Sequence, residues 1–167
     1  MSRHQLRCQM IAPVSIREAF EVFEDPRNLA RITPPWLSFR ITTPEPITMK
    51  KDAVFDYSLK WAGLPLKWRT LITAYEPPFY FVDEMLKGPY VLWRHKHTFH
   101  PGNEGTHITD EVDYELPLGG LGDFVHRVWV ADQLKDIFRY RQMSLNEIMC
   151  GGKARWTEPA VLIPAAT

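Results

Sequence analysis

The stretch "FVDEMLKGPYVLWRHKHTF", residues 81–99, decides the fold because it joins two strand-like runs across a three-residue break. In the second run apolar and charged residues alternate, which is the period of a half-buried strand. The short "KGP" break predicts a hairpin, so the two runs are antiparallel. Because charged side chains belong in water, the uncharged face should point inward. One face carries Trp93, His95, His97 and Phe99, and the other carries Arg94, Lys96 and Thr98.

Similar short runs extend in both directions from this hairpin and are separated by Pro, Gly and other turn residues. Several of the breaks are hairpin-short, so we expect one antiparallel meander. The runs span residues 4–12, 36–43, 53–61, 66–75, 79–86, 90–99 and 106–115.

Two short helices are expected between the first two runs. Ser15 and Glu18 have the spacing of a capping box, which starts a helix. Asp25 followed by Pro26 is typical of a second helix start.

A long helix is expected near the C-terminus. Residues 122–149 contain no Pro and no internal Gly, and their apolar residues recur near helical spacing. Gly151 is a helix stop. We expect this helix to turn Phe124, Val125 and Val128 toward the sheet.

The element order predicts an α+β fold, in which a curved seven-stranded antiparallel sheet wraps around the long C-terminal helix and two short helices follow the first strand. The long helix is the element best able to cover the apolar face of the sheet. We expect one domain over residues 1–150 and an irregular tail over residues 151–167.

This order, with "FVDEMLKGPYVLWRHKHTF", "GTHITDEVDYELPLG" and "IFRYR", resembles the START-like helix-grip (SRPBCC) superfamily. The superfamily includes polyketide cyclases, birch-pollen-allergen-like proteins and lipid-transfer domains, and relatives occur fused to epimerase-like nucleotide-sugar domains. The resemblance implies a cavity between the concave sheet and the helix. It covers roughly residues 3–149 and implies carriers, cyclases, hydrolases or chaperone regulators, without choosing among them.

Composition excludes some classes of protein. Lys plus Arg and Asp plus Glu number 20 each, so the chain lacks the basic surplus of a nucleic-acid binder. The N-terminus has no apolar stretch that would serve as a signal peptide or membrane span, so a cytoplasmic location is expected. The two cysteines, Cys8 and Cys150, are expected to be free thiols.

His95 and Asp110 are the candidates for chemistry. If the turn after Phe99 pairs that residue with Thr106, His95 lies opposite Asp110, within hydrogen-bonding reach. A buried carboxylate needs a donor, and a carboxylate orients an imidazole and raises its basicity. The pair would either hold a ligand's polar group or act as a general base with its orienting partner.

A metal site is the third possibility for this region. His95 and His97 form a His-x-His pair, but a metal needs at least a third ligand. Asp110 is one candidate, and the sequence leaves open whether Asp83 or Glu84 points inward as another. We therefore expect neither a metal nor another cofactor.

The expected ligand is a small hydrophobic, ring-containing molecule. An enzyme of cyclase or dehydratase type is the alternative, and a protein-interaction module of unknown partner is the third class; an exposed apolar patch would favour that third class. The expected pocket residues are Phe55, Tyr57, Trp61, Trp68, Thr70, Phe81, Asp83, Trp93, His95, His97, Asp110, Val112, Tyr114, Phe124, Val125 and Val128.

Overall fold

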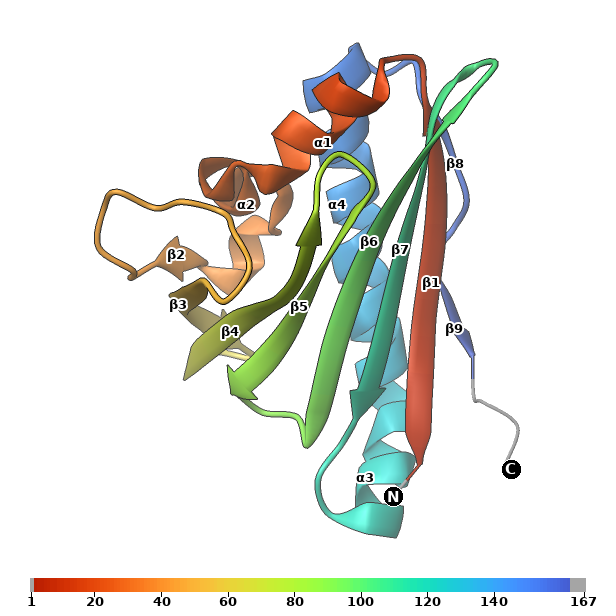
Figure 1. Ribbon diagram of the computed structural model, residues 1–167. Helices are drawn as coiled ribbons and strands as arrows, with labels where there is room; N and C mark the ends of the chain where they lie inside the picture. Colours follow the sequence, from red (N-terminus) through yellow and green to blue (C-terminus); the bar gives the residue numbers. More distant parts are fainter. Residues whose placement is uncertain (1, 163–167) are drawn as a thin grey trace.

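A single antiparallel sheet wraps around a long helix in the computed structural model, which describes residues 2–162 (Figure 1). The described strands run in the order β2-β3-β4-β5-β6-β7-β1-β8, and β9 also pairs with β1. The strands are β1 (Arg3–Ala12), β2 (Arg40–Ile41), β3 (Val54–Trp61), β4 (Leu64–Glu76), β5 (Tyr80–Lys87), β6 (Leu92–Gly102), β7 (Gly105–Glu115), β8 (Arg155–Trp156) and β9 (Ala160–Leu162). The helix-grip architecture expected from the sequence is confirmed.

The two short helices begin where their capping residues predict. Helix α1 (Ile16–Glu24) has a complete capping box: the Ser15 hydroxyl accepts from the Glu18 amide, and the Glu18 carboxylate accepts from the Ser15 amide. Helix α2 (Pro26–Ile32) starts after Asp25, whose carboxylate accepts from the amide of Arg27. Both helices lie at the upper end of the sheet in Figure 1.

The long C-terminal helix is continuous from Gly119 to Cys150 but changes its winding. It consists of α3 (Gly119–Val125), one π-helical segment (His126–Val130) and α4 (Ala131–Cys150). Its buried positions are Gly122, His126, Val130, Leu134, Phe138, Gln142 and Leu145.

The predicted burial of Phe124, Val125 and Val128 is therefore wrong. Their exposed fractions are 54%, 37% and 58%. The buried residues of this segment lie four apart, and the π-helical segment holds more residues per turn than an α-helix, so the apolar triplet falls on the solvent side.

Within residues 151–162 the C-terminal tail is not irregular as predicted, and residues 163–167 of that prediction lie outside the described residues. Residues 155–156 and 160–162 pair with β1 on the side that β7 leaves free, which brings the sheet to nine strands. An uncovered edge strand exposes unpaired amide and carbonyl groups, and the tail supplies partners for part of that edge. The predicted strand 36–43 begins in a 3₁₀ turn (Pro35–Leu37) and contains only two strand residues, which form β2.

The predicted register between β6 and β7 is off by two residues. Phe99 pairs with Ile108, and His97 pairs with Asp110. Both strands continue to a two-residue turn between Gly102 and Gly105, which is tighter than the break assumed from the sequence. A shift of two keeps every side chain on its expected face, so His95, His97 and Asp110 still point inward.

Candidate functional site

A pocket of about 230 Å³ lies between the concave face of the sheet and the helices α1, α2 and α4. The sheet side is lined mainly by aromatic rings from β3, β4, β5 and β6, and Phe138 contributes from α4. Ten of the predicted pocket residues line it: Phe55, Tyr57, Trp61, Trp68, Thr70, Phe81, Asp83, Trp93, His95 and His97.

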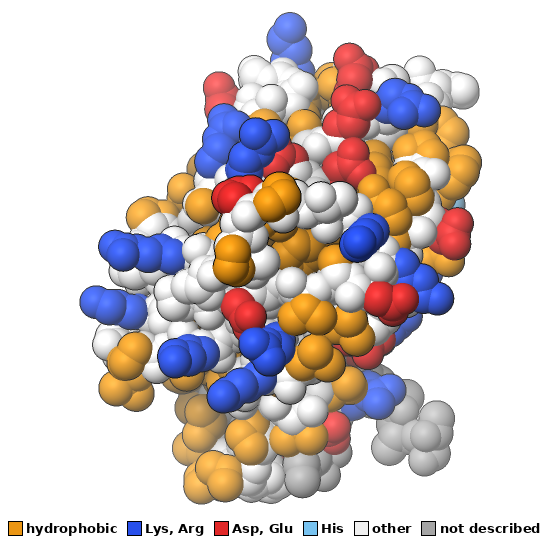
Figure 2. Space-filling view, turned by 60° about the vertical axis from the view of Figure 1, so that its left-hand side comes forward, with side chains coloured by type: hydrophobic (Ala, Val, Ile, Leu, Met, Phe, Trp, Pro, Cys, Tyr) orange, Lys and Arg blue, Asp and Glu red, His pale blue; other side chains and the backbone are white. Residues whose placement is uncertain are grey.

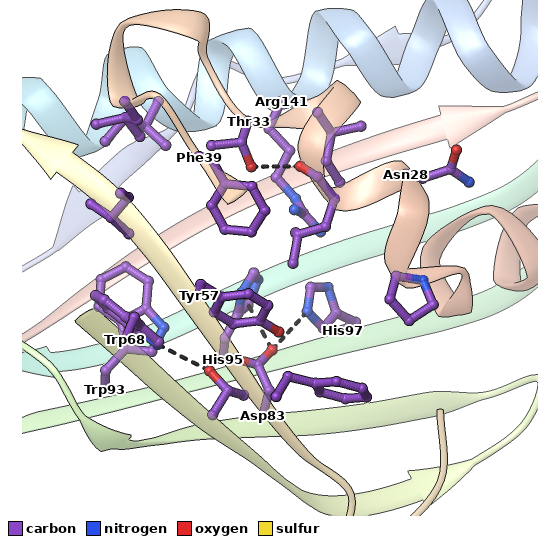
Figure 3. Close-up of a pocket in the computed structure, with 18 of the residues that line it drawn as sticks. Asn28, Thr33, Phe39, Tyr57, Trp68, Asp83, Trp93, His95, His97 and Arg141 are labelled. Carbon is purple, nitrogen blue, oxygen red and sulfur yellow. Dashed lines mark hydrogen bonds and ion pairs between the residues drawn. The ribbon is translucent and has the colours of Figure 1, made fainter. Parts of the chain in front are cut away.

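The polar floor of the pocket consists of Asp83, His95 and His97, which come from the adjacent strands β5 and β6 (Figure 3). Asp83 on β5 pairs in register with His95 on β6, and His97 pairs with Asp110 on β7. Inward side chains of neighbouring strands at matching positions lie within hydrogen-bonding reach. The choice that the sequence left open is therefore resolved: Asp83 faces the pocket, whereas Glu84 contacts Thr73 and Arg94.

Asp110 holds both imidazoles from behind. Its Oδ1 is 3.2 Å from His95 Nε2 and 2.6 Å from His97 Nδ1. Burial alone would raise the pKa of Asp110, but the two histidines and Arg141 together hold it well below its usual value. An ionised carboxylate only accepts hydrogen bonds, so both contacting ring nitrogens carry hydrogen.

The opposite ring nitrogens face Asp83. Oδ2 of Asp83 is 3.2 Å from His97 Nε2 and 3.8 Å from His95 Nδ1. Burial lowers the pKa of His97, but the carboxylates of Asp110 and Asp83 outweigh it and raise this pKa above its usual value. The pKa of His95 is lowered by burial and by its neighbour His97.

The floor is rigidly packed. The ring of His97 stacks on Phe81 with centroids 4.2 Å apart, and Phe23 meets it edge-on. His95 packs against His97 and Phe138. Neither imidazole is free to turn away from the carboxylates that hold it.

Arg141 is a functional candidate that the sequence analysis did not single out. It lines the pocket from α4, with its Nε 3.8 Å from Asp110 Oδ2. The signal was present, because Leu134, Phe138, Arg141 and Leu145 lie on one face at helical spacing. Arg139, by contrast, is a surface residue that pairs with Asp136 and Glu158.

Asp83, His95 and His97 are also the residues that could hold a metal ion. One donor atom from each lies within 4.8 Å of the other two. The same nitrogens could instead accept a hydrogen bond or a proton from a bound molecule.

The remaining predicted pocket residues do not line the pocket. Asp110 lies behind the histidines, and Val112 and Tyr114 are packed in the core beside α4 and the π-helical segment. Phe124, Val125 and Val128 belong to the exposed apolar end described below.

A second pair of buried histidines, His4 and His126, was missed by the sequence reasoning. Their rings stack 3.6 Å apart at 12°, and His126 Nε2 is 2.7 Å from the Tyr114 hydroxyl. One residue is on β1 and the other in the π-helical segment, so only the fold brings them together. The pair lies outside the pocket lining.

Apolar side chains are exposed at the end of the molecule that carries α3 (Figure 2). An exposed apolar cluster is the feature that favours a protein-interaction module. Nothing in the described residues specifies what covers it. These side chains include Leu118, Leu121, Phe124, Val125, Val128 and Trp129. None of the helices within residues 2–162 is long and apolar enough to cross a bilayer.

Comparison with models of known protein families identifies the family of this chain. The family model described as polyketide cyclase / dehydrase and lipid transport matches residues 12–139. The chain belongs to this family. The description of this family, which includes lipid transport, supports a fold that binds hydrophobic ligands. No curated protein matches the sequence.

Solved structures of low sequence identity share the fold. The protein TTHA0849 from Thermus thermophilus is 15% identical with a TM-score of 0.69, and the match covers 89% of this chain and 99% of that one. Ginseng major latex-like protein 151 from Panax ginseng is 15% identical with a TM-score of 0.66 over 89% and 99%. The nucleoside-diphosphate sugar epimerase from Corynebacterium glutamicum is 25% identical with a TM-score of 0.59; the match covers 84% of this chain but 28% of that one.

Proposed function

We propose that the protein binds a small hydrophobic, ring-containing molecule in the pocket and holds its polar group on the floor formed by Asp83, His95 and His97. The observation that carries this proposal is the contrast between the aromatic walls and the cluster of ionisable groups on the floor. Apolar walls supply affinity, and a few convergent polar groups orient the ligand.

The size of the pocket favours a compact ligand. A cavity of about 150 Å³ accepts a benzene molecule, so about 230 Å³ suits a molecule of one or two rings. Flat walls such as Trp68 and Trp93, which meet edge-on with centroids 5.3 Å apart, favour a flat ligand over a long acyl chain.

The polar groups also suggest how the ligand would be oriented. Asp83, His95 and His97 lie on the sheet side, whereas Arg141 comes from the helix on the other side (Figure 3). A hydroxyl or carbonyl oxygen between them would be within reach of both sides. Since Asp110 fixes both imidazoles from behind, the floor is prepared for the ligand before it binds.

The orientation of both imidazoles by Asp110 also favours a second candidate function, acid–base chemistry of cyclase or dehydratase type. His97 would then be the base that Asp110 orients, because its contact with Asp110 is the shorter one. Turnover of a ligand identified from the native source, abolished in His97→Gln, would support catalysis.

Binding is tested with 8-anilinonaphthalene-1-sulfonate, a fluorescent molecule of fused and single rings. We expect saturable one-to-one binding to the wild type, and native mass spectrometry of protein purified from its own source should show a co-purified small molecule. Leu66→Trp fills the pocket and should weaken probe binding at least about tenfold. Leu64→Trp changes an exposed residue on the same strand and should leave binding unchanged.

Two results would contradict the proposal. One is the absence of both saturable probe binding and a co-purified molecule. The other is equal probe affinity in Leu66→Trp and Leu64→Trp, which would place the probe elsewhere on the surface.

A further inference from the structure

We propose that Asp83, His95 and His97 form a binding site for a divalent first-row transition-metal ion at the floor of the pocket. This inference does not depend on which molecule occupies the pocket. It rests on the arrangement of donor atoms, on the carboxylate behind them and on the balance of charge.

The first argument is the spacing of the donor atoms. Bonds of about 2.0–2.2 Å to a metal separate neighbouring donors by about 3.0–3.5 Å. Asp83 Oδ2 lies 3.2 Å from His97 Nε2 and 3.8 Å from His95 Nδ1. The three donors lie within 4.8 Å of one another, so no separation would have to shorten by more than about 1.3 Å to close the donors around one ion.

The second argument is the outer carboxylate. Histidines that bind metals usually donate their other ring N–H to a carboxylate or carbonyl, which fixes the tautomer and the ring orientation. Asp110 does this for both histidines at once, through His95 Nε2 and His97 Nδ1. A purely structural histidine pair does not require both rings to be oriented toward one common point.

The third argument is what the two rings present to Asp83. A neutral imidazole has one ring nitrogen with hydrogen and one with a lone pair. Because Asp110 accepts a hydrogen bond from the N–H of each ring, the other nitrogens, His95 Nδ1 and His97 Nε2, present lone pairs. These two lone pairs converge with a carboxylate oxygen, and such a group of acceptors needs a cation among them. A metal ion serves both nitrogens and the oxygen together, whereas one proton serves a single nitrogen.

The fourth argument is the net charge of the buried groups. Asp83 and Asp110 contribute two negative charges, and Arg141, 3.8 Å from Asp110, contributes one positive charge. While both imidazoles are neutral, one negative charge remains uncompensated among these groups, at the side where the donors converge. Arg141 offsets the outer carboxylate and leaves Asp83 for the ion.

The donor chemistry indicates which ion fits. Two imidazoles and one carboxylate suit zinc, iron, cobalt or nickel in the divalent state better than magnesium or calcium, which prefer oxygen ligands only. The remaining coordination positions would face the pocket, where an oxygen of a bound molecule or water could occupy them.

The test uses the full chain without a histidine tag, stripped with a chelator and dialysed, with folding checked by far-ultraviolet circular dichroism. Co²⁺ is titrated while its visible absorption is recorded, and Zn²⁺ is then added as a competitor. We expect one Co²⁺ per chain and its displacement by Zn²⁺. Asp110→Asn should weaken Co²⁺ binding about 10–100-fold, and Asp83→Asn should weaken it more.

Glu84→Gln is the matched control, because Glu84 neighbours Asp83 but contacts Thr73 and Arg94 instead. It should bind Co²⁺ as the wild type does. No stoichiometric uptake of Co²⁺ or Zn²⁺ by the wild type would overturn the proposal, as would equal affinities in Asp83→Asn and Glu84→Gln.

A second readout does not need the variants to fold. Zn²⁺ added to the wild type should shift the ring signals of His95 and His97 in NMR spectra and leave the exposed His100 and His107 unchanged. Shifts confined to the exposed rings would overturn the proposal. Probe binding in the pocket is measured separately, so failure of the metal site and failure of the proposed function are distinguishable.

Discussion

Two buried histidine pairs lie inside the same protein in opposite electrostatic surroundings. His95 and His97 are held between two carboxylates, whereas both ring nitrogens of His4 are buried without a hydrogen-bond partner among residues 2–162. His4 Nε2 lies 3.8 Å from Asp123 Oδ1. Burial is similar in both pairs, so the carboxylates make the difference.

The pKa values express this contrast. For His97 the carboxylates overcome burial and raise the pKa, but burial dominates at His126 and lowers its pKa to about 4. Burial likewise lowers the pKa of His4. The comparison shows that a buried histidine keeps a raised pKa only where carboxylates lie beside it. On the pocket floor His97 is prepared for charge, whereas burial and the neighbouring His97 lower the pKa of His95; the His4–His126 pair is kept neutral.

The strongest test of this contrast removes the shared acid of the pocket floor. Asp110→Ala leaves Arg141 and His97 without their buried carboxylate, and losing one partner of a buried charged network costs about 3–5 kcal/mol. Glu111→Ala, on the outer face of the same strand, removes only a partly exposed contact with Arg7 and should cost about 0–1 kcal/mol.

Urea unfolding at neutral pH measures both variants. Equal losses in Asp110→Ala and Glu111→Ala would mean that Asp110 does not hold the floor together. The contrast between the two histidine pairs would then have no energetic basis.

The second test uses pH and concerns the neutral pair. The pKa of His126 is about 4 in the folded protein and about 6.5 in an unfolded chain. Between these values the unfolded chain binds more protons than the folded protein does. The contribution of His126 to the free energy of unfolding is therefore fully present above about pH 6.5 and is lost as the pH drops toward 4. The loss attributable to His126 is about 3 kcal/mol at most.

His126→Gln removes this titration and should flatten the decline in stability between pH 6.5 and 4. His100→Gln, at an exposed position, should leave the decline as in the wild type. The measurement is urea unfolding across this pH range. An unchanged slope in His126→Gln would show that the stacked pair is not the acid-sensitive element.

The sequence predicts the pocket floor better than the second pair for a physical reason. Strand alternation has a period of two, so it places His95, His97 and Asp110 on the inner face even when the register is wrong by two residues. His4 and His126 belong to elements far apart in the chain, and no local pattern relates them. Only the packing of β1 against the C-terminal helix makes them neighbours.

The errors at the two ends of the chain have similar causes. The tail has little strand-like patterning, and it becomes strands because the edge of β1 needs hydrogen-bond partners. The long helix is recognisable from its spacing, but a π-helical segment shifts which residues face inward. That shift moves Val128 out and His126 in, where His126 meets Tyr114 of β7.

The smallest expected effect on stability tests which face of the helix is buried in the π-helical segment. Val128 and Val130 lie two residues apart in the π-helical segment, with exposed fractions of 58% and 1%. Val128→Ala removes methyl groups that are largely in water, and alanine gains about 0.5 kcal/mol or less in helix propensity, so stability should change by about 0.5 kcal/mol at most. Val130→Ala removes fully buried methyl groups beside the helix–sheet contact and should cost about 1–3 kcal/mol. Thermal and urea unfolding of the two variants compare the same chemical change on opposite faces. A larger loss for Val128→Ala would mean that the helix turns Val128 toward the sheet, as expected from the sequence. His126 would then point away from His4, and the neutral histidine pair would not exist.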